Sequence, residues 1–231
     1  MEEIVKYNNE FNQVCMRDFT AAEIDVFMTL CAKVKENECR KVTMDLRELK
    51  QLSEYQKNGI ENFRMFILNL NRKIQSISYE ISSGSKTIQF VLFPYFETDI
   101  SNMTLTVAVN PEFAFLLNDF AFGNWTKFYL KEITTLRSKY SKNLHRCLRQ
   151  YTRFGWWQTS LREIRNRLGI PESCNSKNVF SKYIGPAMKE LVDKAYYKDI
   201  KCIPIKSSDQ SHKIEGYRFE FETTGLKSQE L

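Results

Sequence analysis

The chain has 231 residues, 42% of them hydrophobic and 27% charged, which is enough for one large domain or two small ones with real cores. Its net charge of +6 is compatible with a polyanionic partner but does not by itself establish one. No apolar run approaches the roughly 18 residues of a membrane span, and Met1 opens a polar segment, so we expect a cytoplasmic protein with no signal peptide and no membrane partner.

The first half of the chain has the pattern of a helix, a strand, two helices and then strands. The first strong helix is preceded by a polar segment that we expect to form a short strand or arm. In order, the predicted segments are the arm at 3–12, a helix at 20–35, a strand at 42–44, helices at 46–52 and 56–72, strands at 74–82 and 86–96 around a Ser-Gly-Ser turn, a strand at 105–109 and a short helix at 111–118.

The second half repeats the order of helix, strand, two helices and two strands. The segments are a helix at 127–153 with a bend near 138–141, an extended segment at 156–159, a short helix at 161–168, a longer helix at 176–194, and strands at 196–206 and 216–223. The polar residues 206–213 between the last two strands would form the tip of a hairpin.

Local signals fix the two helices at the centre of this half. Ser160, with Glu163 three residues later, has the pattern of a capping box, and Gly169 followed by Ile170 and Pro171 ends the short helix. The longer helix should bury one stripe of apolar residues. That stripe is Val179, Phe180, Tyr183, Ile184, Ala187, Met188, Leu191 and Val192.

A short helix, a turn and a longer helix form a helix-turn-helix, and the hairpin that follows makes it a winged helix. Because both halves have the same order of elements, we predict an α+β fold of two tandem winged-helix (helix-turn-helix) domains, at 1–120 and 121–231. The boundary falls near 119–124, where Asn, Asp and Gly cluster. No spacer rich in Pro, Ser or Gly is present, so little linker is expected.

The charge is unevenly distributed between the two halves. Residues 1–120 hold 13 Lys and Arg against 17 Asp and Glu, a net charge of −4, and residues 121–231 hold 21 against 11, a net charge of +10. Neutralisation of phosphates would supply much of any DNA affinity and make it salt-dependent. A solvated basic surface is the alternative. We favour double-stranded DNA as the partner, with the second domain as the sequence-specific one.

Candidate DNA-binding residues follow from this layout, because the second helix of such a unit enters the major groove. Lysines there can bond phosphates or guanine edges, and asparagines can bond adenine. Arginines on the preceding helix would clamp the backbone, as would the wing lysines. In the second domain the candidates are Arg162, Arg165, Asn175, Ser176, Lys177, Asn178, Ser181, Lys182, Lys206 and Lys213; in the first, Lys57, Arg64 and Lys73 would contact phosphates.

Catalysis is not indicated by any motif. There is no Gly-x4-Gly-Lys loop for ATP, the only histidines are His145 and His212, which form no paired metal motif, and acidic residues form no cluster for Mg²⁺. We expect a protein that is not an enzyme and has no metal or cofactor, with His145 structural. The six cysteines form no Cys-x-x-Cys pair, which favours buried free thiols over a disulfide or metal role.

Three segments of the second half resemble the initiator Rep family of plasmid replication proteins, the iteron-binding, theta-type initiators built from two winged helices. They are LRSKYSKNLHRCLRQY, GWWQTSLREIRNRLGIP and FSKYIGPAMKELVDKA, and KYNNEFNQ at 6–13 resembles the family's opening segment. The likeness covers nearly the whole chain, more loosely in its first half.

This resemblance implies a function and a division of labour. A plasmid replication initiator would bind directly repeated origin sites (iterons) as a monomer, help to open an adjacent AT-rich segment and recruit host replication proteins such as the helicase or initiator. As a dimer it would repress its own promoter. The family's second winged helix recognises most of the sequence, while the first contacts the DNA backbone and forms the dimer interface, with the strands at 74–82 and 86–96 as candidate dimer surfaces. For the apolar run at 88–96 we favour the alternative of an inner core strand.

Two other functions remain open at this stage. A dimeric winged-helix transcriptional regulator would bind a palindrome, but it needs only one winged helix with a dimer element, whereas here two comparable modules fill the chain. A protein-interaction module that never contacts DNA is disfavoured by the charge of +10 in the second half.

Overall fold

The computed structural model describes residues 2–35, 37, 40–57, 59–75, 78–83, 85–117, 124–208 and 213–224, with the backbone alone for 78–83, 86–90 and 113. Residues 119–123 of the predicted boundary, Cys39, and residues 209–212 of the predicted wing tip, which include His212, therefore lie outside the described residues. The chain forms two compact units, Met1–Val14 with Ala22–Trp125 and Cys15–Ala21 with Thr126–Leu231. Within the described part, no helix is long and apolar enough to cross a membrane.

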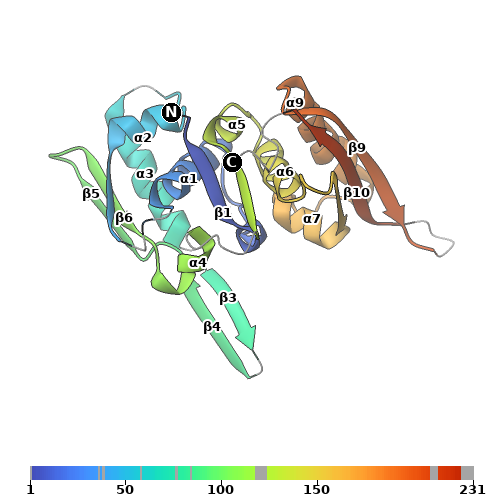
Figure 1. The fold of residues 1–231 in the computed structure, drawn as a ribbon, viewed down its shortest axis with the longest axis horizontal. Coiled ribbons are helices and arrows are strands. Elements are labelled where there is room, and N and C mark those ends of the chain that lie inside the picture. The colour runs from blue at the N-terminus through green and yellow to red at the C-terminus, as the bar shows by residue number, and fades with distance from the viewer. Residues whose placement is uncertain are drawn as a thin grey trace. The chain divides into compact units, whose positions relative to one another are not determined.

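The first unit contains the predicted order of helix, strand, two helices and a strand pair (Figure 1). Its elements are β1 (Ile4–Asn8), a 3-10 turn (Asn9–Gln13), α1 (Ala21–Val34), β2 (Val42–Asp45), α2 (Leu46–Leu52), α3 (Ile60–Gln75), β3 (Ser78–Ser83), β4 (Lys86–Val91), β5 (Tyr95–Asp99), β6 (Thr104–Ala108), a 3-10 turn (Pro111–Phe113) and α4 (Ala114–Leu117).

Two predicted boundaries in this unit were wrong. Helix α3 starts at Ile60, not at 56, because Gly59 adopts a left-handed backbone with φ +82°. It continues to Gln75, so Ile74 is a buried helical residue and not the start of a strand.

The predicted strand at 86–96 is two strands. Pro94 lacks the N–H that a ladder needs, and Phe93 is buried in the core against the ring of Phe27. The wing of this unit is consequently β5 with β6, in a sheet of order β2-β6-β5, and β3 with β4 form a separate hairpin.

The second half of the chain contains a winged helix with a three-stranded sheet of order β8-β10-β9. Its elements are β7 (Trp125–Tyr129), α5 (Leu130–Thr134), α6 (Lys139–Gln150), β8 (Trp156–Ser160), α7 (Leu161–Leu168), α8 (Ser176–Val179), a π-helical turn (Phe180–Ile184), α9 (Gly185–Asp193), β9 (Tyr197–Lys206) and β10 (Ile214–Thr223).

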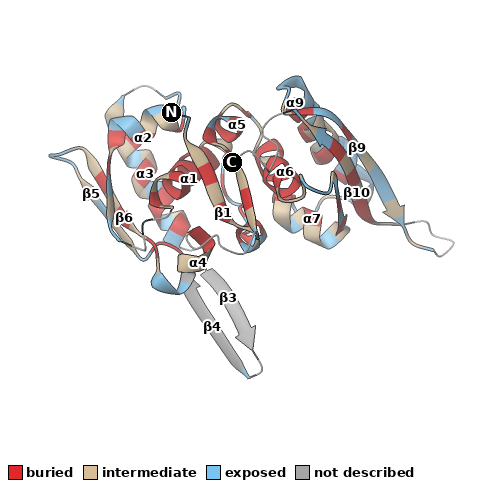
Figure 2. Cartoon of the chain, viewed as in Figure 1, coloured by how far each residue is buried: buried red, intermediate tan, exposed pale blue. Residues whose placement is uncertain are grey.

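The core of the second unit lies between the helices and one face of this sheet. Helix α6 packs on α7 and α9, which in turn contact β10 and β9. Trp157 of β8 is paired with Phe219 of β10, and their rings stack 5.3 Å apart between centroids. Figure 2 shows the inward faces of these elements as buried, and α6 is buried on nearly every side because other segments of the unit cover it.

The single helix predicted at 127–153 is a strand followed by two helices. Residues 127–129 belong to β7, α5 ends at Thr134, and α6 begins after the N-cap Ser138. The carboxylate of Glu190, from α9, accepts hydrogen bonds from the backbone N–H groups of Arg137 and Ser138 and from the Ser141 hydroxyl. A residue fifty positions away therefore stabilises the start of α6, and no local pattern indicates it.

The longer helix of the helix-turn-helix is interrupted by one π-helical turn. The N–H of Gly185 donates to the carbonyl of Phe180, five residues back, and Pro186 has no N–H to continue a regular ladder. Because of this turn, two residues that are five positions apart in the sequence, Val179 and Ile184, are both buried, whereas three or four positions separate buried residues on a regular α-helix. The predicted buried stripe was wrong at two positions, because Phe180 is 41% exposed and Val192 is 36% exposed.

Candidate nucleic-acid interface

Helix α7 is fixed at both ends by the residues predicted to do so. The Ser160 hydroxyl accepts a hydrogen bond from the N–H of Glu163 at 3.1 Å, and Gly169 caps the other end with φ +70°. A Cβ at Gly169 would lie 2.8 Å from the Cα of Arg17, a distance that real Cβ atoms do not reach. Glycine is required there by the backbone conformation and by this close approach.

Arg165 organises the turn between the two helices. Its guanidinium donates to the carbonyl oxygens of Pro171 at 3.1 Å, Glu172 at 3.3 Å and Cys174 at 2.6 Å. The predicted role of Arg165 was a clamp on the DNA backbone. With its donors directed at three carbonyls of the turn, this side chain sets the geometry of the turn itself.

Arg162 is placed differently on the same helix. It is exposed and lines an open depression of about 690 Å³ between α7 and the wing, together with Arg165, Asn166, Glu172, Ile214 and Glu215. The two glutamates make this hollow mixed in charge. Arg162 can reach a phosphate laid along its edge.

Arg17, which no sequence pattern indicated, supports the same turn. Its guanidinium contacts the Glu172 carboxylate at 3.0 Å and the side-chain oxygen of Asn166 at 3.2 Å. The hydrogen bond to Glu172 raises the pKa of Arg17 above its usual value. No sequence signal could identify this residue, because 149 positions separate it from Asn166.

The predicted recognition residues lie together at the start of the longer helix. Asn175 is its N-cap, and its side-chain oxygen accepts a hydrogen bond from the N–H of Lys177 at 3.0 Å. Lys177, Asn178, Ser181 and Lys182 are exposed, while Ser176 is half-buried. Asn175 therefore uses its acceptor within the helix, which leaves Lys177 and Asn178 as the residues best placed to reach a base.

The wing presents the two predicted lysines. Lys206 and Lys213 are exposed at the loop end of the β9–β10 hairpin, where Lys206 pairs with Ile214 across the ladder. Ser207 closes the hairpin, because its N–H donates to the Lys213 carbonyl at 2.8 Å and its hydroxyl accepts from the Lys213 N–H at 3.0 Å. The backbones of Lys206 and Lys213 are therefore fixed by hydrogen bonds, while their side chains face solvent.

The three candidates in the first unit have unequal surroundings. Lys57 is exposed ahead of α3. Arg64 is paired with Glu61 one turn earlier, and Lys73 lies 2.7 Å from Glu23 of α1. Since Arg64 and Lys73 already have carboxylate partners, any phosphate would compete with those pairs.

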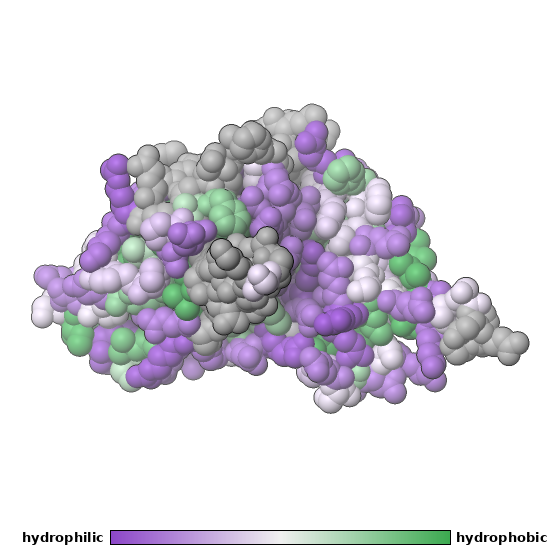
Figure 3. Space-filling view, turned by 90° about the horizontal axis from the view of Figure 1, so that it is seen from below, coloured by the Kyte–Doolittle hydropathy of each residue, from purple (hydrophilic) through white to green (hydrophobic). Residues whose placement is uncertain are grey.

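Hydrophilic residues cover most of the face shown in Figure 3, and hydrophobic residues occur there as small separate patches among the described part of the chain. Within the sequence 173–189 there is no Asp or Glu, while Lys177, Lys182 and Lys189 are present.

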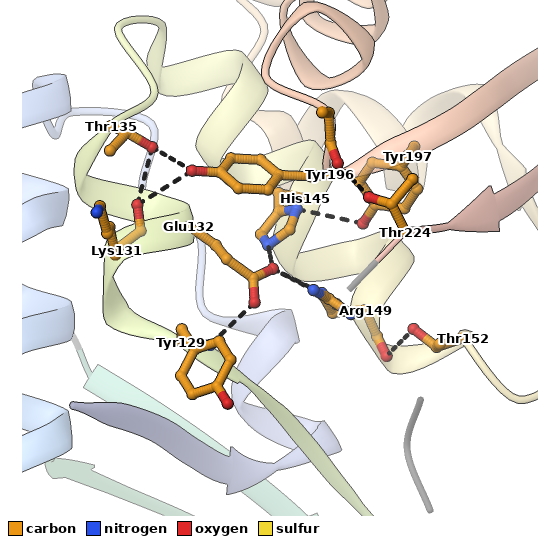
Figure 4. Close-up of polar contacts among 11 residues, drawn as sticks. Tyr129, Lys131, Glu132, Thr135, His145, Arg149, Thr152, Tyr196, Tyr197 and Thr224 are labelled. Atoms are coloured by element: carbon orange, nitrogen blue, oxygen red, sulfur yellow. Dashed lines mark hydrogen bonds and ion pairs between the residues drawn. The ribbon is translucent and has the colours of Figure 1, made fainter. Parts of the chain in front are cut away.

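Glu132, His145 and Arg149 form a buried ion network in the second unit (Figure 4). The carboxylate of Glu132 accepts hydrogen bonds from the Tyr129 N–H and from the Arg149 guanidinium, and Nε2 of His145 lies 3.0 Å from it. Nδ1 of His145 is 3.2 Å from the hydroxyl of Tyr197. A carboxylate only accepts, so Nε2 carries the proton and Nδ1 accepts from the hydroxyl.

The charges of this network follow from its burial. Despite the cost of desolvation, His145 and Arg149 lower the pKa of Glu132 to about 2, so it is ionised. Complete burial, opposed by Glu132 and aided by the nearby cations Arg149 and Lys142, lowers the pKa of His145 below its usual 6.5. A neutral His145 between the Glu132 carboxylate and the Tyr197 hydroxyl has the structural role that we predicted, and it ties α5 and α6 to β9.

The described cysteines differ in exposure. Of the five described cysteines, Cys31 and Cys147 are buried and none is in a disulfide, whereas Cys15 is exposed, contrary to the prediction of burial for these thiols. The described residues contain no group of three or more His, Cys, Asp or Glu that could hold a metal ion.

Comparison with known proteins identifies the family. The model described as "Initiator Replication protein, WH1" matches residues 4–149. A protein of Bifidobacterium longum (strain NCC 2705) described as "Probable replication protein rep" is 35% identical, over 97% of this chain and 86% of that relative. The chain belongs to the initiator replication protein family. This confirms the resemblance to the initiator Rep family of plasmid replication proteins.

Solved structures show the same fold as this initiator. The "Pi initiator protein in complex with iteron DNA" superposes with a TM-score of 0.74 at 13% identity, covering 97% of this chain and 99% of that one. Domains 2 and 3 of RctB superpose with a TM-score of 0.53 at 11% identity, covering 90% and 84%. The initiator therefore has the predicted α+β fold built from winged helices.

Proposed function

We propose that this initiator starts plasmid DNA replication by binding repeated origin sites, the iterons, through its winged helices. One observation carries the proposal: an acid-free segment at 173–189 forms the start of the recognition helix, with Lys177 and Asn178 exposed on it. The likeness in fold to the Pi initiator, whose structure is of a complex with iteron DNA, supports the same ligand class.

The roles of individual residues follow from their surroundings. Lys177 and Asn178 recognise base edges, while Ser176, Ser181 and Lys182 line the approach to the groove. Arg162, Lys206 and Lys213 contact phosphates on either side and fix the register. Asn175 and Arg165 act indirectly, since the first caps the helix and the second holds the turn.

The first unit supplies sequence-independent contacts in this proposal. Lys57 is its best-placed cation, and Arg64 and Lys73 contribute where a phosphate displaces Glu61 or Glu23. Self-association through this unit would allow a dimer that represses the initiator's own promoter. As a monomer, the protein would open the adjacent AT-rich segment and recruit the host helicase or initiator, without a catalytic step of its own.

A binding titration tests the proposal. Purified initiator would be added to the DNA upstream of its own gene at two salt concentrations, with the oligomeric state measured at each step. We expect one protomer per direct repeat and an affinity that falls steeply with salt, because each neutralised phosphate releases counterions. Binding only to a palindrome as a dimer would favour a transcriptional regulator. No binding at either salt would favour a protein-interaction module.

Variants separate base recognition from backbone contact. Lys177→Ala and Asn178→Ala should each lose about 1–3 kcal/mol of discrimination between the repeat and a scrambled sequence. Lys206→Ala should weaken binding to both DNAs alike and reduce the salt dependence. If Lys177→Ala weakened both DNAs equally, the assignment of base recognition to this helix would be wrong.

A further inference from the structure

The exposed ring of Phe180, which the sequence pattern had placed in the buried stripe, has no role in the proposed function. It lies on the recognition helix one turn after Lys177 and beside Ser181, all three of them exposed. Its neighbours Val179 and Ile184 are fully buried, so the solvent-facing position of Phe180 is set by the helix itself.

The π-helical turn holds this ring in place. A Cβ on Gly185 would lie 3.6 and 3.7 Å from two carbons of the Phe180 ring and 3.3 Å from the Phe180 carbonyl. The ring thus lies over the backbone of Gly185, where no side chain intervenes. Pro186 stabilises the turn because it cannot donate a regular helical bond.

The charges around the Phe180 ring indicate what kind of partner it contacts. An exposed aromatic residue on a helix fits either an apolar pocket of a protein or an apolar group in a nucleic-acid groove. Here the flanking charges are Lys177 and Lys182, and 173–189 contains no acidic residue. A polyanion therefore matches this face, and the apolar group that the DNA major groove offers is the C5 methyl of thymine.

We propose that Phe180 determines part of the sequence specificity by packing against the methyl group of a thymine in each repeat. This inference rests on the proposed function and adds a residue and a base to it. Lys177 supplies polar recognition one turn earlier, and Phe180 supplies apolar recognition on the same face of the helix.

Thymine-to-deoxyuridine substitution tests the contact with the unaltered protein. Each thymine of one repeat is replaced in turn by deoxyuridine, which removes only the methyl group. We expect affinity to fall about fourfold at one thymine, the effect of withdrawing one methyl-sized apolar group from contact. If removal of every methyl leaves the affinity unchanged, the proposal is overturned, while the binding itself still supports the proposed function. If the unaltered protein binds no repeat, the proposed function fails first and this inference fails with it.

Variants of the ring assign the effect to Phe180. Phe180→Ala should bind the natural repeat more weakly and lose its sensitivity to the deoxyuridine that affects the unaltered protein, whereas Phe180→Leu should retain part of it. Phe154→Ala is the matched control, because Phe154 is 69% exposed in the same unit but outside the recognition helix. Full sensitivity in Phe180→Ala would show that another residue contacts the methyl, and would instead favour an acidic protein as the partner of this ring.

Discussion

Two arginines three positions apart on α7 have different tasks. Arg165 bonds three carbonyls of the turn, and Arg162 is exposed. We predict that Arg165→Ala lowers the free energy of unfolding by about 1–3 kcal/mol, because three carbonyls lose their donors, and that DNA affinity falls with it. Arg162→Ala should leave the melting temperature unchanged and weaken binding to every DNA sequence alike. Thermal melting with binding titrations checks both, and equal melting temperatures would refute the structural role of Arg165.

Glu132 is the residue on which the buried network depends. The substitution Glu132→Gln removes the carboxylate that contacts both His145 and Arg149 (Figure 4). We expect a loss of about 3–5 kcal/mol in urea unfolding, because a buried guanidinium is left without its counter-charge. Glu61→Gln, which breaks an exposed pair with Arg64, is the control and should change stability far less.

The same network predicts a pH dependence. Burial lowers the pKa of His145 in the folded protein. At a pH below 6.5, its usual pKa, the imidazole is therefore protonated in the unfolded chain but stays neutral in the folded one. Stability should fall as the pH is reduced from 7 to 5.5, by up to about 1.4 kcal/mol per pH unit for this group. The contribution of Glu132, complete above pH 4.5, is lost only as the pH falls towards 2.

Unfolding by urea at pH 7.5, 6.5 and 5.5 measures this slope. His145→Gln should flatten it across that range, since glutamine does not titrate. Greater stability of the unaltered protein at pH 5.5 would mean instead that His145 is protonated in the folded state.

At the level of the elements, Gly169 is the point on which the α7 turn depends. Gly169 and Gly155 both have φ +70°, but a Cβ would lie 2.8 Å from Arg17 Cα at the first and 3.4 Å from the Phe221 carbonyl at the second. Alanine at either position should lower the free energy of unfolding by about 1–2 kcal/mol, because its Cβ disfavours the left-handed backbone. We predict that Gly169→Ala loses about 1–3 kcal/mol more in urea unfolding, because its Cβ also meets backbone. Equal losses would show that the close approach relaxes freely.

The elements whose signals are local were predicted well. Helices α2 and α7 have the predicted bounds because Asp45 and Ser160 cap them directly. The bend predicted near 138–141 coincides with the start of α6, but the strand β7 and the separate helix α5 before it were missed. Glu190, from a distant helix, holds the start of α6, and no local pattern indicates that contact. Pro186 inside the predicted helix was a signal that the regular hydrogen bonding would be interrupted. The π-helical turn before it separates the buried residues Val179 and Ile184 by five positions and leaves Phe180 outside the core.

Prediction of the candidate site had a similar limit. Residue types and helix positions predicted that Lys177 and Asn178 lie on the outer face of the helix, and both are exposed. Residue type and position were not sufficient for Arg165, whose donors are directed at carbonyls that only the folded turn brings together. A sequence shows which cations are available, but not which of them already have a partner.

At the scale of the whole molecule, the second unit is not continuous in sequence. Residues Cys15–Ala21 belong to it. Within the unit, the buried side chain of Met16 lies 3.1 Å from the Arg146 guanidinium, and the Arg17 carbonyl accepts a hydrogen bond from Lys139 at 2.8 Å.

We predict that a fragment of residues 126–231 melts at a lower temperature than the same unit in the full chain. It would lack the contacts that 15–21 make with Arg146, Lys139 and Glu172. Joining 15–21 to the fragment through a flexible linker should restore part of the difference, whereas a scrambled segment of the same composition should not. A fragment that melts like the intact unit would make this segment dispensable.

The separation of this segment also affects the order of events during synthesis. The ribosome releases 15–21 first and then makes the 104 residues 22–125 before any residue of 126–231 exists. At roughly 5–20 residues per second, those seven residues wait about 5–20 s, and longer for Glu172. The nascent chain can complete its first unit in that time, while the second unit can form its full set of contacts only when translation is nearly finished.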